Sequence, residues 1–362
     1  MAGVRVIVFD ITSHPDVAQA SRAVEILREH ACRLLVTVNE WGLDTEGIIH
    51  LYCESAGVFH INWCVDDPFY EEIMLKKKYL PSGRRIDFVS DRDYLSSMRK
   101  RGYNAHFLPL GVDPQLFCPS SAEPRYVNDG AFVGNSYIAQ ISEFTQGAEP
   151  LLEGMVPFLA DCMQRYYRDA SVDIAGEVER YLGTAGLPQG ISREKAVFIA
   201  KHFAGFLFRK HIVGKLLSGI PGFIVYGDDG WRELAGAERL RKVRYDRALC
   251  EAYATTKVNV DINRVVIRNG FTQRIFDTLA SGAFVITSAK PVVDEFFITT
   301  GADQEVATFI NAGELVDKVR YYLRHEEERL AIARKGREKV LAAHTYDHRV
   351  QEIFRVVAEQ FG

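Results

Sequence analysis

Arginines and one aspartate gather in a single short segment of the sequence. Arg264, Arg268 and Arg274 fall within eleven positions around Gly270, and Asp277 follows Arg274 at the spacing of one helical turn. A guanidinium binds two phosphate oxygens through its planar fork, and the free amides at a helix N-terminus attract the same anions. The segment therefore indicates a phosphate site. The competing interpretation is that two of the three arginines face solvent or pair with acidic residues.

Further candidates stand where apolar runs end. Tyr226 and Gly227 close the run 222–227, where a glycine lets the backbone approach a nucleotide, although an ordinary turn also explains them. A base that activates a hydroxyl needs a titratable group, and the candidates in the N-terminal half are Asp67 and His14. Asp67 precedes Pro68, so turn formation competes with catalysis as its role, and His14 has a surface role as its alternative.

Motifs for metals and cofactors are not convincing in this sequence. Asp91 and Asp93 have the Asp-x-Asp form of some metal sites, but they begin a predicted helix, where acidic residues cap free amides. His344 and His348 have a zinc-like spacing without a third ligand nearby. Neither the phosphate loop Gly-x4-Gly-Lys-Ser/Thr nor Gly-x-Gly-x-x-Gly occurs. We therefore predict no metal site and no resident cofactor, and kinase and dehydrogenase activities lack support.

The elements that would position these residues alternate between strands and helices. Apolar runs that favour strands in the N-terminal half lie at 4–11, 33–39, 57–65, 85–90 and 104–110. Helical patterns separate them, including one near 71–79. This alternation predicts a parallel, doubly wound sheet, in which ligands bind beyond the carboxyl ends of the strands. The residues at those ends are His14, Glu40, Asp66, Asp67, Ser90 and Asp91.

The C-terminal half repeats the α/β pattern after a linker. Residues 111–130 are rich in proline and polar residues and predict the link between two domains. Strand-like runs lie at 130–135, 222–227, 257–263, 283–287 and 305–310. The region 140–215 is helical in pattern and long for an insertion. The predicted organisation is a domain at 1–120, a second at 121–345 that contains this helical region, and a last helix at 346–362.

Composition and charge exclude several classes of function. The 362 residues suffice for two domains, and a net charge of -4 with a pI near 6.2 gives no global field for nucleic acid. No run approaches the ~20 apolar residues that span a bilayer, and the N-terminus lacks the pattern of a signal peptide. The six cysteines are scattered, as in a reduced protein. We expect a soluble cytoplasmic protein with no nucleic-acid partner and no transmembrane segment.

The order and spacing of several motifs resemble a known family. The segment NGFTQRIFD (269–277) and the closing HTYDHR (344–349) are similar to the C-terminal domain of group 1 glycosyltransferases, most closely the bacterial spore-maturation, CgeB-like branch. WCVDDPF (63–69) and HFLPLGVDPQLFCP (106–119) resemble the N-terminal half and the linker of the same branch. The resemblance covers nearly the whole chain except the helical region.

This resemblance implies a GT-B fold, in which two Rossmann-like domains with parallel sheets face each other across a cleft and the last helix crosses back onto the first domain. It also implies that the second domain holds a nucleotide sugar such as a UDP-sugar. Group 1 enzymes often carry a Glu-x7-Glu pair whose second member binds ribose, and Asn269 and Asp277 take those positions here. Asn269 lacks the charge of a carboxylate. The donor-binding candidates are Arg264, Arg268, Asn269, Gly270, Arg274, Asp277, Tyr226 and Gly227.

The implied activity is metal-independent transfer of a sugar from a nucleoside-diphosphate sugar to an unidentified acceptor hydroxyl, on a protein, a polysaccharide or a small molecule. Asp67 or His14 would serve as the base if the enzyme inverts configuration, and a retaining enzyme would need neither. Two alternatives stay open. One is a sugar-nucleotide epimerase or isomerase on the same fold, and the other is a noncatalytic nucleotide-sugar-binding protein, which the departures at Asn269 and Asp277 suggest.

Overall fold

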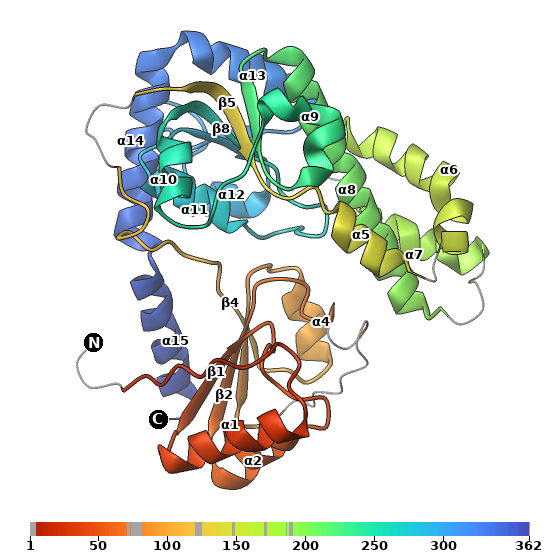
Figure 1. Cartoon of the computed structure of the whole chain (residues 1–362), viewed down its shortest axis with the longest axis vertical. Coiled ribbons are helices and arrows are strands. Elements are labelled where there is room, and N and C mark those ends of the chain that lie inside the picture. Colours follow the sequence, from red (N-terminus) through yellow and green to blue (C-terminus); the bar gives the residue numbers. More distant parts are fainter. Residues whose placement is uncertain are drawn as a thin grey trace. The chain divides into compact units, whose positions relative to one another are not determined.

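The computed structural model describes residues 5–70, 73, 82–119, 125–146, 149–169, 172–185, 187 and 191–361. The chain divides into two compact units, Met1–Pro109 and Leu110–Gly362 (Figure 1). Each unit has a parallel sheet, as the alternation of strands and helices predicted. The helix predicted near 71–79 lies outside the described residues, apart from Ile73.

The first unit is built on a four-stranded parallel sheet. Its strands, in spatial order, are β1 (Leu34–Val38), β2 (Phe59–Cys64), β3 (Arg85–Val89) and β4 (Ala105–Phe107). Its helices are α1 (Val17–Glu29), α2 (Ile48–Ala56) and α4 (Tyr94–Lys100). A capping box starts α1, because Asp16 accepts from the amide of Gln19 and the Gln19 side chain returns to the amide of Asp16. The four strands fall inside four of the five runs expected to be strands.

The remaining strand prediction for this unit was wrong. Residues 5–11 form no strand, and Val6 and Val8 are 76% and 89% exposed. Among the described strands, β1, with Val36 and Val38 also exposed, pairs with β2 and lies at the edge of the sheet. An apolar run becomes a strand only when a neighbouring strand pairs with it, and periodicity alone does not reveal that partner.

The second unit is built on a six-stranded parallel sheet in the order β10-β9-β8-β5-β6-β7. The strands are β5 (Asn128–Val133), β6 (Phe223–Tyr226), β7 (Leu240–Arg241), β8 (Thr256–Asp261), β9 (Val285–Ser288) and β10 (Ala307–Phe309). The central pair, β5 and β8, is far apart in sequence, with Gly130 opposite Val258 and Phe132 opposite Val260. Their carboxyl ends are therefore adjacent, at the position where ligands bind to sheets of this kind.

The second unit also contains the helices that connect and follow its strands. They are α5 (Ile138–Thr145), α6 (Glu149–Tyr166), α7 (Ile174–Ala185), α8 (Arg193–Gly219), the 3-10 turn η1 (Asp229–Trp231), α9 (Arg232–Arg239), α10 (Arg247–Ala254), α11 (Gln273–Ala280), α12 (Pro291–Phe296), α13 (Ala312–Arg324), α14 (Glu326–Ala343) and α15 (Tyr346–Phe361). Figure 1 shows α6 and α7 on the side of α8 away from the sheet. The region expected to be helical, 140–215, is thus α5 to α8, and α8 joins it to the core.

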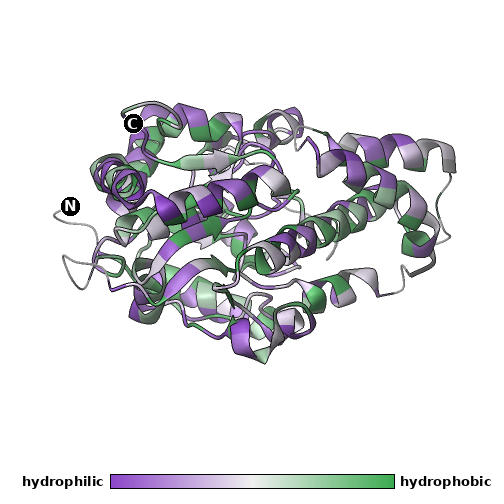
Figure 2. Cartoon of the chain, turned by 90° about the horizontal axis from the view of Figure 1, so that it is seen from above, coloured by the Kyte–Doolittle hydropathy of each residue, from purple (hydrophilic) through white to green (hydrophobic). Residues whose placement is uncertain are grey.

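Helix α8 is buried along much of its length because it contacts elements on several sides. It packs against β6 and α13 on one side and against α5, α6 and α7 on another. Its buried residues include Ala200, Ala204, Phe208 and Ile212, together with one charged side chain, Arg209. Figure 2 shows that most helices carry hydrophobic and hydrophilic residues side by side along their length. None of the described helices is long and apolar enough to span a membrane.

The end of the chain is attached to the start of the second unit. Between α14 and α15 the backbone pairs with the linker, since Val112 donates to the carbonyl of His344 and accepts from the amide of Tyr346. Arg349 donates to the carbonyl of Leu110 at 3.1 Å. A Cβ at Gly111 would lie 3.0 Å from the backbone of Thr345, so the close approach requires glycine. The expectation that the last helix, α15, crosses back onto the first domain stays a prediction.

Candidate functional site

The carboxyl end of β8 holds a buried aspartate that organises the residues around it. Asp261 accepts hydrogen bonds from Thr272 at 2.7 Å and from Thr287 at 2.9 Å. Its remaining partner is Arg274, in the first turn of α11, whose Nε lies 2.9 Å from Asp261 Oδ1. Arg274 also donates to the carbonyl of Ile262 at 3.3 Å. The Arg274 side chain is 21% exposed, and the ion pair with Asp261 fixes its orientation.

A second arginine reaches the same place from α8. Arg209 is 1% exposed and donates to the carbonyls of Asn135 at 3.0 Å and Ile262 at 3.4 Å. None of the carboxylates in the described part of the chain forms an ion pair with it, and its Nε is buried without a hydrogen-bond partner. Burial, together with the charges of Arg274 and Arg264, lowers the pKa of Arg209 to about 10. A buried cation without a counter-charge is costly, so an anion brought here would be stabilised.

Tyr137 lies between these arginines and a third one. The guanidinium of Arg209 lies 4.5 Å from the centre of its ring, and that of Arg264 lies 5.7 Å away. Burial by itself would raise the pKa of Tyr137, but the charges of Arg264, Arg209 and Arg274 together lower it. We call Arg209, Arg264 and Arg274 the arginine cluster. It brings three guanidiniums close to Tyr137 and Asp261 at one end of the second sheet.

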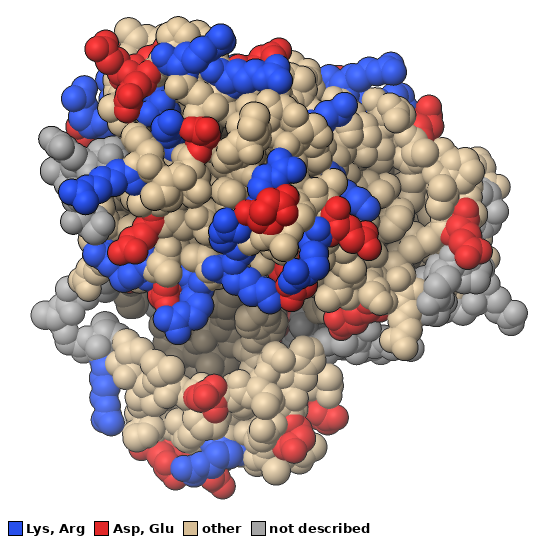
Figure 3. Space-filling model, turned by 45° about the horizontal axis from the view of Figure 1, so that its top comes forward, with Lys and Arg blue, Asp and Glu red and all other residues tan. Residues whose placement is uncertain are grey.

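The rest of the visible surface does not share this excess of positive charge. Figure 3 shows lysine and arginine side chains interspersed with aspartate and glutamate on the face in view. The net charge of -4 agrees with such mixing. The overall charge therefore supplies no general attraction for anions.

The loop after β5, residues 134–137, is held by the residues after β6. Trp231 donates to the carbonyl of Gly134 at 2.8 Å, and the amide of Ser136 donates to Asp228 at 3.0 Å. A Cβ at Gly227 would come within 2.5 Å of the Gly134 carbonyl oxygen. Gly227 thus permits the close packing that places Tyr137. The hydroxyl of Tyr226 accepts a hydrogen bond from Asn128, the first residue of β5. This hydroxyl is therefore at the start of β5 and not at its carboxyl end.

The loop between β8 and α11 carries the other predicted donor residues. Arg268 forms an ion pair with Asp173 at 3.5 Å, and both side chains are about half exposed. Asn269 accepts from the amide of Val292 at 3.1 Å and so holds the start of α12. Gly270 is buried where the loop turns into α11. Lys290 donates hydrogen bonds to the carbonyls of Ile267 and Arg268 and so helps to fix the conformation of the loop.

Asp277 is buried on α11 beneath an exposed tyrosine. Its side chain is 1% exposed, the hydroxyl of Tyr245 donates to its Oδ2 at 2.9 Å, and its Oδ1 has no hydrogen-bond partner. Burial raises the pKa of Asp277 to about 8, although the hydrogen bond from Tyr245 opposes the change. Tyr245 is 56% exposed and also accepts from Gln273. A ligand could reach this carboxyl only after Tyr245 moves.

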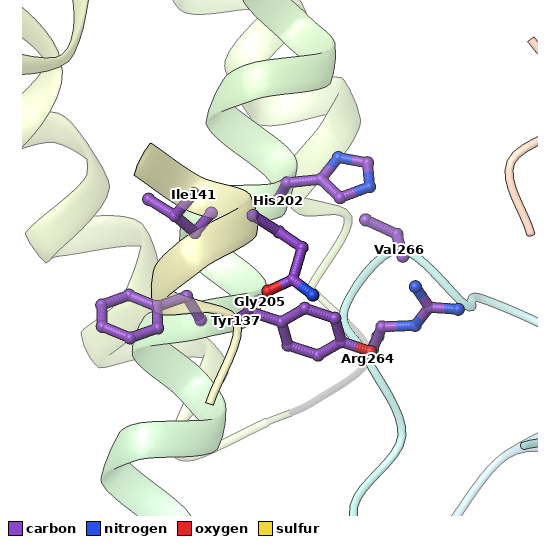
Figure 4. Close-up of a pocket in the computed structure, with 8 residues that line it drawn as sticks. Tyr137, Ile141, His202, Gly205, Arg264 and Val266 are labelled. Carbon is purple, nitrogen blue, oxygen red and sulfur yellow. The ribbon is translucent and has the colours of Figure 1, made fainter. Parts of the chain in front are cut away.

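A small pocket adjoins the arginine cluster. Its residues come from α5 with the residue before it, from α8, and from the loop after β8 (Figure 4). Tyr137 and Arg264 line the pocket, and they also connect it to the arginine cluster, of which Arg264 is a member. Ile141, Gly205 and Val266 form apolar walls. The cavity volume is about 20 Å³, which is room for about one water molecule.

The two candidate bases lie in the first unit. His14 is exposed and its Nδ1 lies 3.0 Å from the Ser13 hydroxyl, and Asp67 accepts from the amide of Phe69 at 3.0 Å at the end of β2. The Asp67 contact is that of a turn-forming residue. Asp91 likewise accepts from the amide of Asp93, next to the start of α4. Throughout the described residues, no group of three or more His, Cys, Asp or Glu is placed to hold a metal ion.

One polar cluster of the first unit was only partly foreseen. Glu40, nominated as a strand-end residue, is 6% exposed and forms an ion pair with Arg85, which also contacts Asp87 at 2.6 Å. Asn62 joins them through the Asp87 carboxylate and the amide of Glu40. Both Asn39 and Glu40 have positive φ values, which bend the chain sharply after β1. This cluster fixes the loop at the carboxyl end of β1.

Sequence reasoning missed Arg209 and Tyr137 as site residues. Tyr137 follows the predicted strand of the second unit by a few positions and has no motif of its own. Arg209 stands beside Lys210 and His211, and by sequence alone such a trio is typical of a solvated helix face or of an acceptor contact. Its burial is the signal, and burial depends on the packing of α8.

Comparison with known proteins places the second unit in a functional context. Residues 207–355, from the middle of α8 into α15, match the family model described as glycosyl transferase-like. The matched segment includes all three arginines of the cluster and Asp277. No curated protein sequence matches the chain.

Solved structures resemble the whole chain. Sucrose-phosphate synthase from Thermosynechococcus elongatus aligns with 94% of this chain and 77% of its own, at 11% identity and a TM-score of 0.53. Anabaena HepE in complex with UDP-glucose aligns over 97% and 85%, at 10% identity and a TM-score of 0.52. A glycosyltransferase from Rickettsia africae aligns over 95% and 81%, at 12% identity and a TM-score of 0.51. The fold is GT-B, and the family model supports a glycosyltransferase.

Proposed function

We propose that this protein transfers a glycosyl group from a UDP-sugar to an acceptor hydroxyl, without a metal ion or another cofactor. The observation that carries the proposal is the arginine cluster, in which the guanidiniums of Arg209, Arg264 and Arg274 converge at the carboxyl ends of β5 and β8 and Arg209 is buried. The choice of UDP follows the UDP-glucose complex of HepE. The motif 269–277 supports the finer assignment to group 1 enzymes and their CgeB-like branch.

The cluster supplies the electrostatic stabilisation that sugar transfer needs. As the bond from the anomeric carbon to the diphosphate breaks, negative charge accumulates on the diphosphate, and fixed cations stabilise that charge most where water is excluded. Arg274 is oriented by Asp261, and Arg209 by two backbone carbonyls. Neither needs to reorganise when the charge develops. Charge neutralisation by arginines replaces the divalent metal that other glycosyl transfers use.

The ribose of the donor would bind Asp277. Its Oδ1 has no hydrogen-bond partner, and a ribose hydroxyl could take the place that the Tyr245 hydroxyl now holds at Oδ2. Gly270, at the turn before α11, would lie near the diphosphate. We assign Asn269 a supporting role, because it holds the start of α12. Arg268, Tyr226 and Gly227 stay as predicted donor contacts, although each has a structural partner or packing role.

On the acceptor side, the proposal keeps His14 and Asp67 as candidate bases for an inverting reaction. His14 is exposed, and Asp67 is half-buried at the end of β2. A His14→Ala or Asp67→Asn variant that loses turnover but keeps UDP affinity would support that role. If both variants keep full turnover, the enzyme uses another base or retains configuration. The proposal leaves the acceptor open as a protein, a polysaccharide or a small molecule, and includes no nucleic-acid partner.

Titration calorimetry with UDP tests the site. We expect Arg264→Ala and Arg274→Ala each to weaken UDP binding at least tenfold, because each loses a hydrogen bond to a charged phosphate worth roughly 1.5–3 kcal/mol. Arg355→Ala is the matched control, since this arginine is 54% exposed on α15 and pairs only with neighbouring glutamates in its own helix. Unchanged affinity in both cluster variants would refute the site.

Product analysis after incubation with UDP-glucose and UDP-N-acetylglucosamine tests the reaction. Release of UDP, with or without an added acceptor, supports glycosyl transfer, and activity that survives EDTA supports metal independence. An intact sugar nucleotide with altered stereochemistry would instead show an epimerase. Binding without any conversion would show a noncatalytic binding protein.

A further inference from the structure

Tyr137 occupies a backbone position that does not suit its residue type. It is the N-cap residue of α5, where serine, threonine, aspartate and asparagine are preferred, and its side chain forms no capping hydrogen bond. Its φ is 66°, in the left-handed region that bulky side chains rarely adopt. Asparagine or glycine would fit both requirements better. Local stability therefore does not explain a tyrosine here, and strained residues of this kind cluster at functional sites.

Hydrogen bonds on both sides of Tyr137 hold this conformation. The preceding residue, Ser136, is buried, and its amide donates to Asp228 at 3.0 Å. The Ser136 hydroxyl accepts from the amide of Ile138, the residue after Tyr137, at 3.2 Å. The loop after β5 therefore sets the direction in which the Tyr137 ring points.

The ring lies among the guanidiniums of the arginine cluster. Arg209 lies 4.5 Å and Arg264 lies 5.7 Å from the ring centre, and Figure 4 shows the hydroxyl end of Tyr137 toward the Arg264 side chain. Burial by itself would raise the pKa of this phenol, yet the charges of Arg264, Arg209 and Arg274 lower it. A phenol in such surroundings is a stronger hydrogen-bond donor than an ordinary tyrosine.

The phenol hydrogen of Tyr137 is directed away from the arginines. Arg209 interacts with the phenol oxygen, and a guanidinium donates hydrogen bonds without accepting any, so the phenol hydrogen has to find its acceptor elsewhere. Tyr137 is half-buried, so part of the side chain is open to a ligand. A diphosphate oxygen bound by the cluster is an acceptor of the required kind.

We infer that Tyr137 is a further catalytic residue of the transfer reaction, whose hydroxyl donates a hydrogen bond to the diphosphate of the donor as the glycosyl bond breaks. The proton stays on the phenol, so the step needs no co-reactant. Hydrogen bonds to a charged acceptor are stronger than those to a neutral one, so this bond strengthens as negative charge accumulates on the diphosphate. The inference rests on the proposed function.

Tyr137→Phe removes the hydroxyl and keeps the ring. The phenylalanine ring can still pack against Arg209 and Arg264, and the backbone strain is unchanged, so the variant isolates the proposed hydrogen bond. Tyr181→Phe, on α7, is the matched control. The hydroxyl of Tyr181 donates to the carbonyl of Gly154 at 3.2 Å, and that residue belongs to no part of the proposed donor site.

The experiment measures UDP affinity by calorimetry and the rate of UDP release from saturating UDP-glucose and UDP-N-acetylglucosamine, with the full-length protein. Tyr137→Phe should weaken UDP binding about tenfold, because it removes one hydrogen bond to a charged group. The saturating rate should fall further, by about a hundredfold, as when one donor to a developing negative charge is removed. Tyr181→Phe should keep both wild-type values.

The outcomes separate this inference from the proposed function. If the wild-type protein binds UDP and releases it from a donor, but Tyr137→Phe keeps either the wild-type affinity or the wild-type saturating rate, the catalytic role of Tyr137 is overturned and the proposed function stands. If the wild-type protein neither binds UDP nor releases it, the proposed function itself fails.

A second measurement applies if Tyr137→Phe does not fold, which a circular dichroism melt detects. Fluorotyrosine incorporated at position 137 keeps the hydroxyl and provides a fluorine NMR signal. This signal should shift when UDP is added and stay in place when uridine, which lacks the diphosphate, is added instead. A signal that does not move with UDP, although calorimetry shows that UDP binds, would overturn the inference.

Discussion

Replacing Asp277 by asparagine should stabilise the folded protein at neutral pH while weakening nucleotide binding. Burial raises the pKa of this carboxyl from 3.8 to about 8. Between these values the folded protein keeps a proton on Asp277 that the unfolded chain has released. The contribution of Asp277 to stability is therefore fully present below about pH 4 and falls as the pH rises toward 8. An asparagine side chain does not titrate, so this loss disappears in the variant.

The structure gives the size of the effect. Each pH unit inside the window costs about 1.4 kcal/mol, and about three units separate pH 7 from the lower pKa, so the cost at pH 7 is on the order of 4 kcal/mol. The asparagine keeps an oxygen for the hydrogen bond from Tyr245. Its amide nitrogen, placed where Oδ1 has no partner, adds a penalty of roughly 1–3 kcal/mol that does not vary with pH. The pH slope of the stability difference therefore reports the carboxyl itself.

Urea unfolding of the wild-type protein and Asp277→Asn, repeated from about pH 5 to about pH 8, measures this slope. We expect the stability advantage of the variant to grow by about 1.4 kcal/mol per pH unit. Asp303→Asn is the control, because the Asp303 side chain is 80% exposed and pairs only with Lys335, and its difference should stay nearly flat. A difference between Asp277→Asn and wild type that is equal at both ends of the range would refute the reasoning.

Three further changes test other parts of the site. Arg209→Met should raise the free energy of unfolding by about 1–3 kcal/mol, because it replaces a buried cation that has no ion pair by an apolar side chain. The same variant should weaken UDP binding at least tenfold. Thermal melts measure the stability and calorimetry the affinity, and a destabilised variant would contradict the first expectation. Tyr245→Phe should tighten UDP binding about fivefold, since one hydrogen bond to Asp277 no longer has to be broken, and weaker binding would speak against displacement of the phenol. Gly227→Ala should destabilise the protein by about 2 kcal/mol through a clash with the loop after β5, measured against Gly154→Ala, where a Cβ meets nothing within 4 Å.

The sequence predicted the parallel sheets because their signals are local. Each strand of the two sheets is a short apolar run that stands between turn residues, except the two-residue β7. The run 4–11 has the same local signal, yet residues 5–11 form no strand. Pairing between strands is a long-range property, and a one-dimensional pattern does not contain it.

The same distinction separates the site residues that were found from those that were missed. Arg274 follows a glycine turn and starts a helix, and that local context was enough to nominate it. Arg209 is buried because α8 lies against Asn135 and Ile262, which are 74 and 53 positions away in sequence. Asp277 was nominated for ribose, but the tyrosine that covers it stands 32 positions earlier. Contacts at such separations decide burial and charge state, and sequence spacing cannot report them.

The pairing between the linker and the break before α15 has a consequence for dividing the protein into parts. Val112 uses both its amide and its carbonyl on the backbone of residues 344–346, and a Cβ added at Gly111 would lie 3.0 Å from that backbone. A fragment that begins at residue 110 and stops at 343 would leave these groups without partners and remove Arg349 from the carbonyl of Leu110. The smallest fragment of the second unit that keeps this backbone pairing must therefore include the first turn of α15.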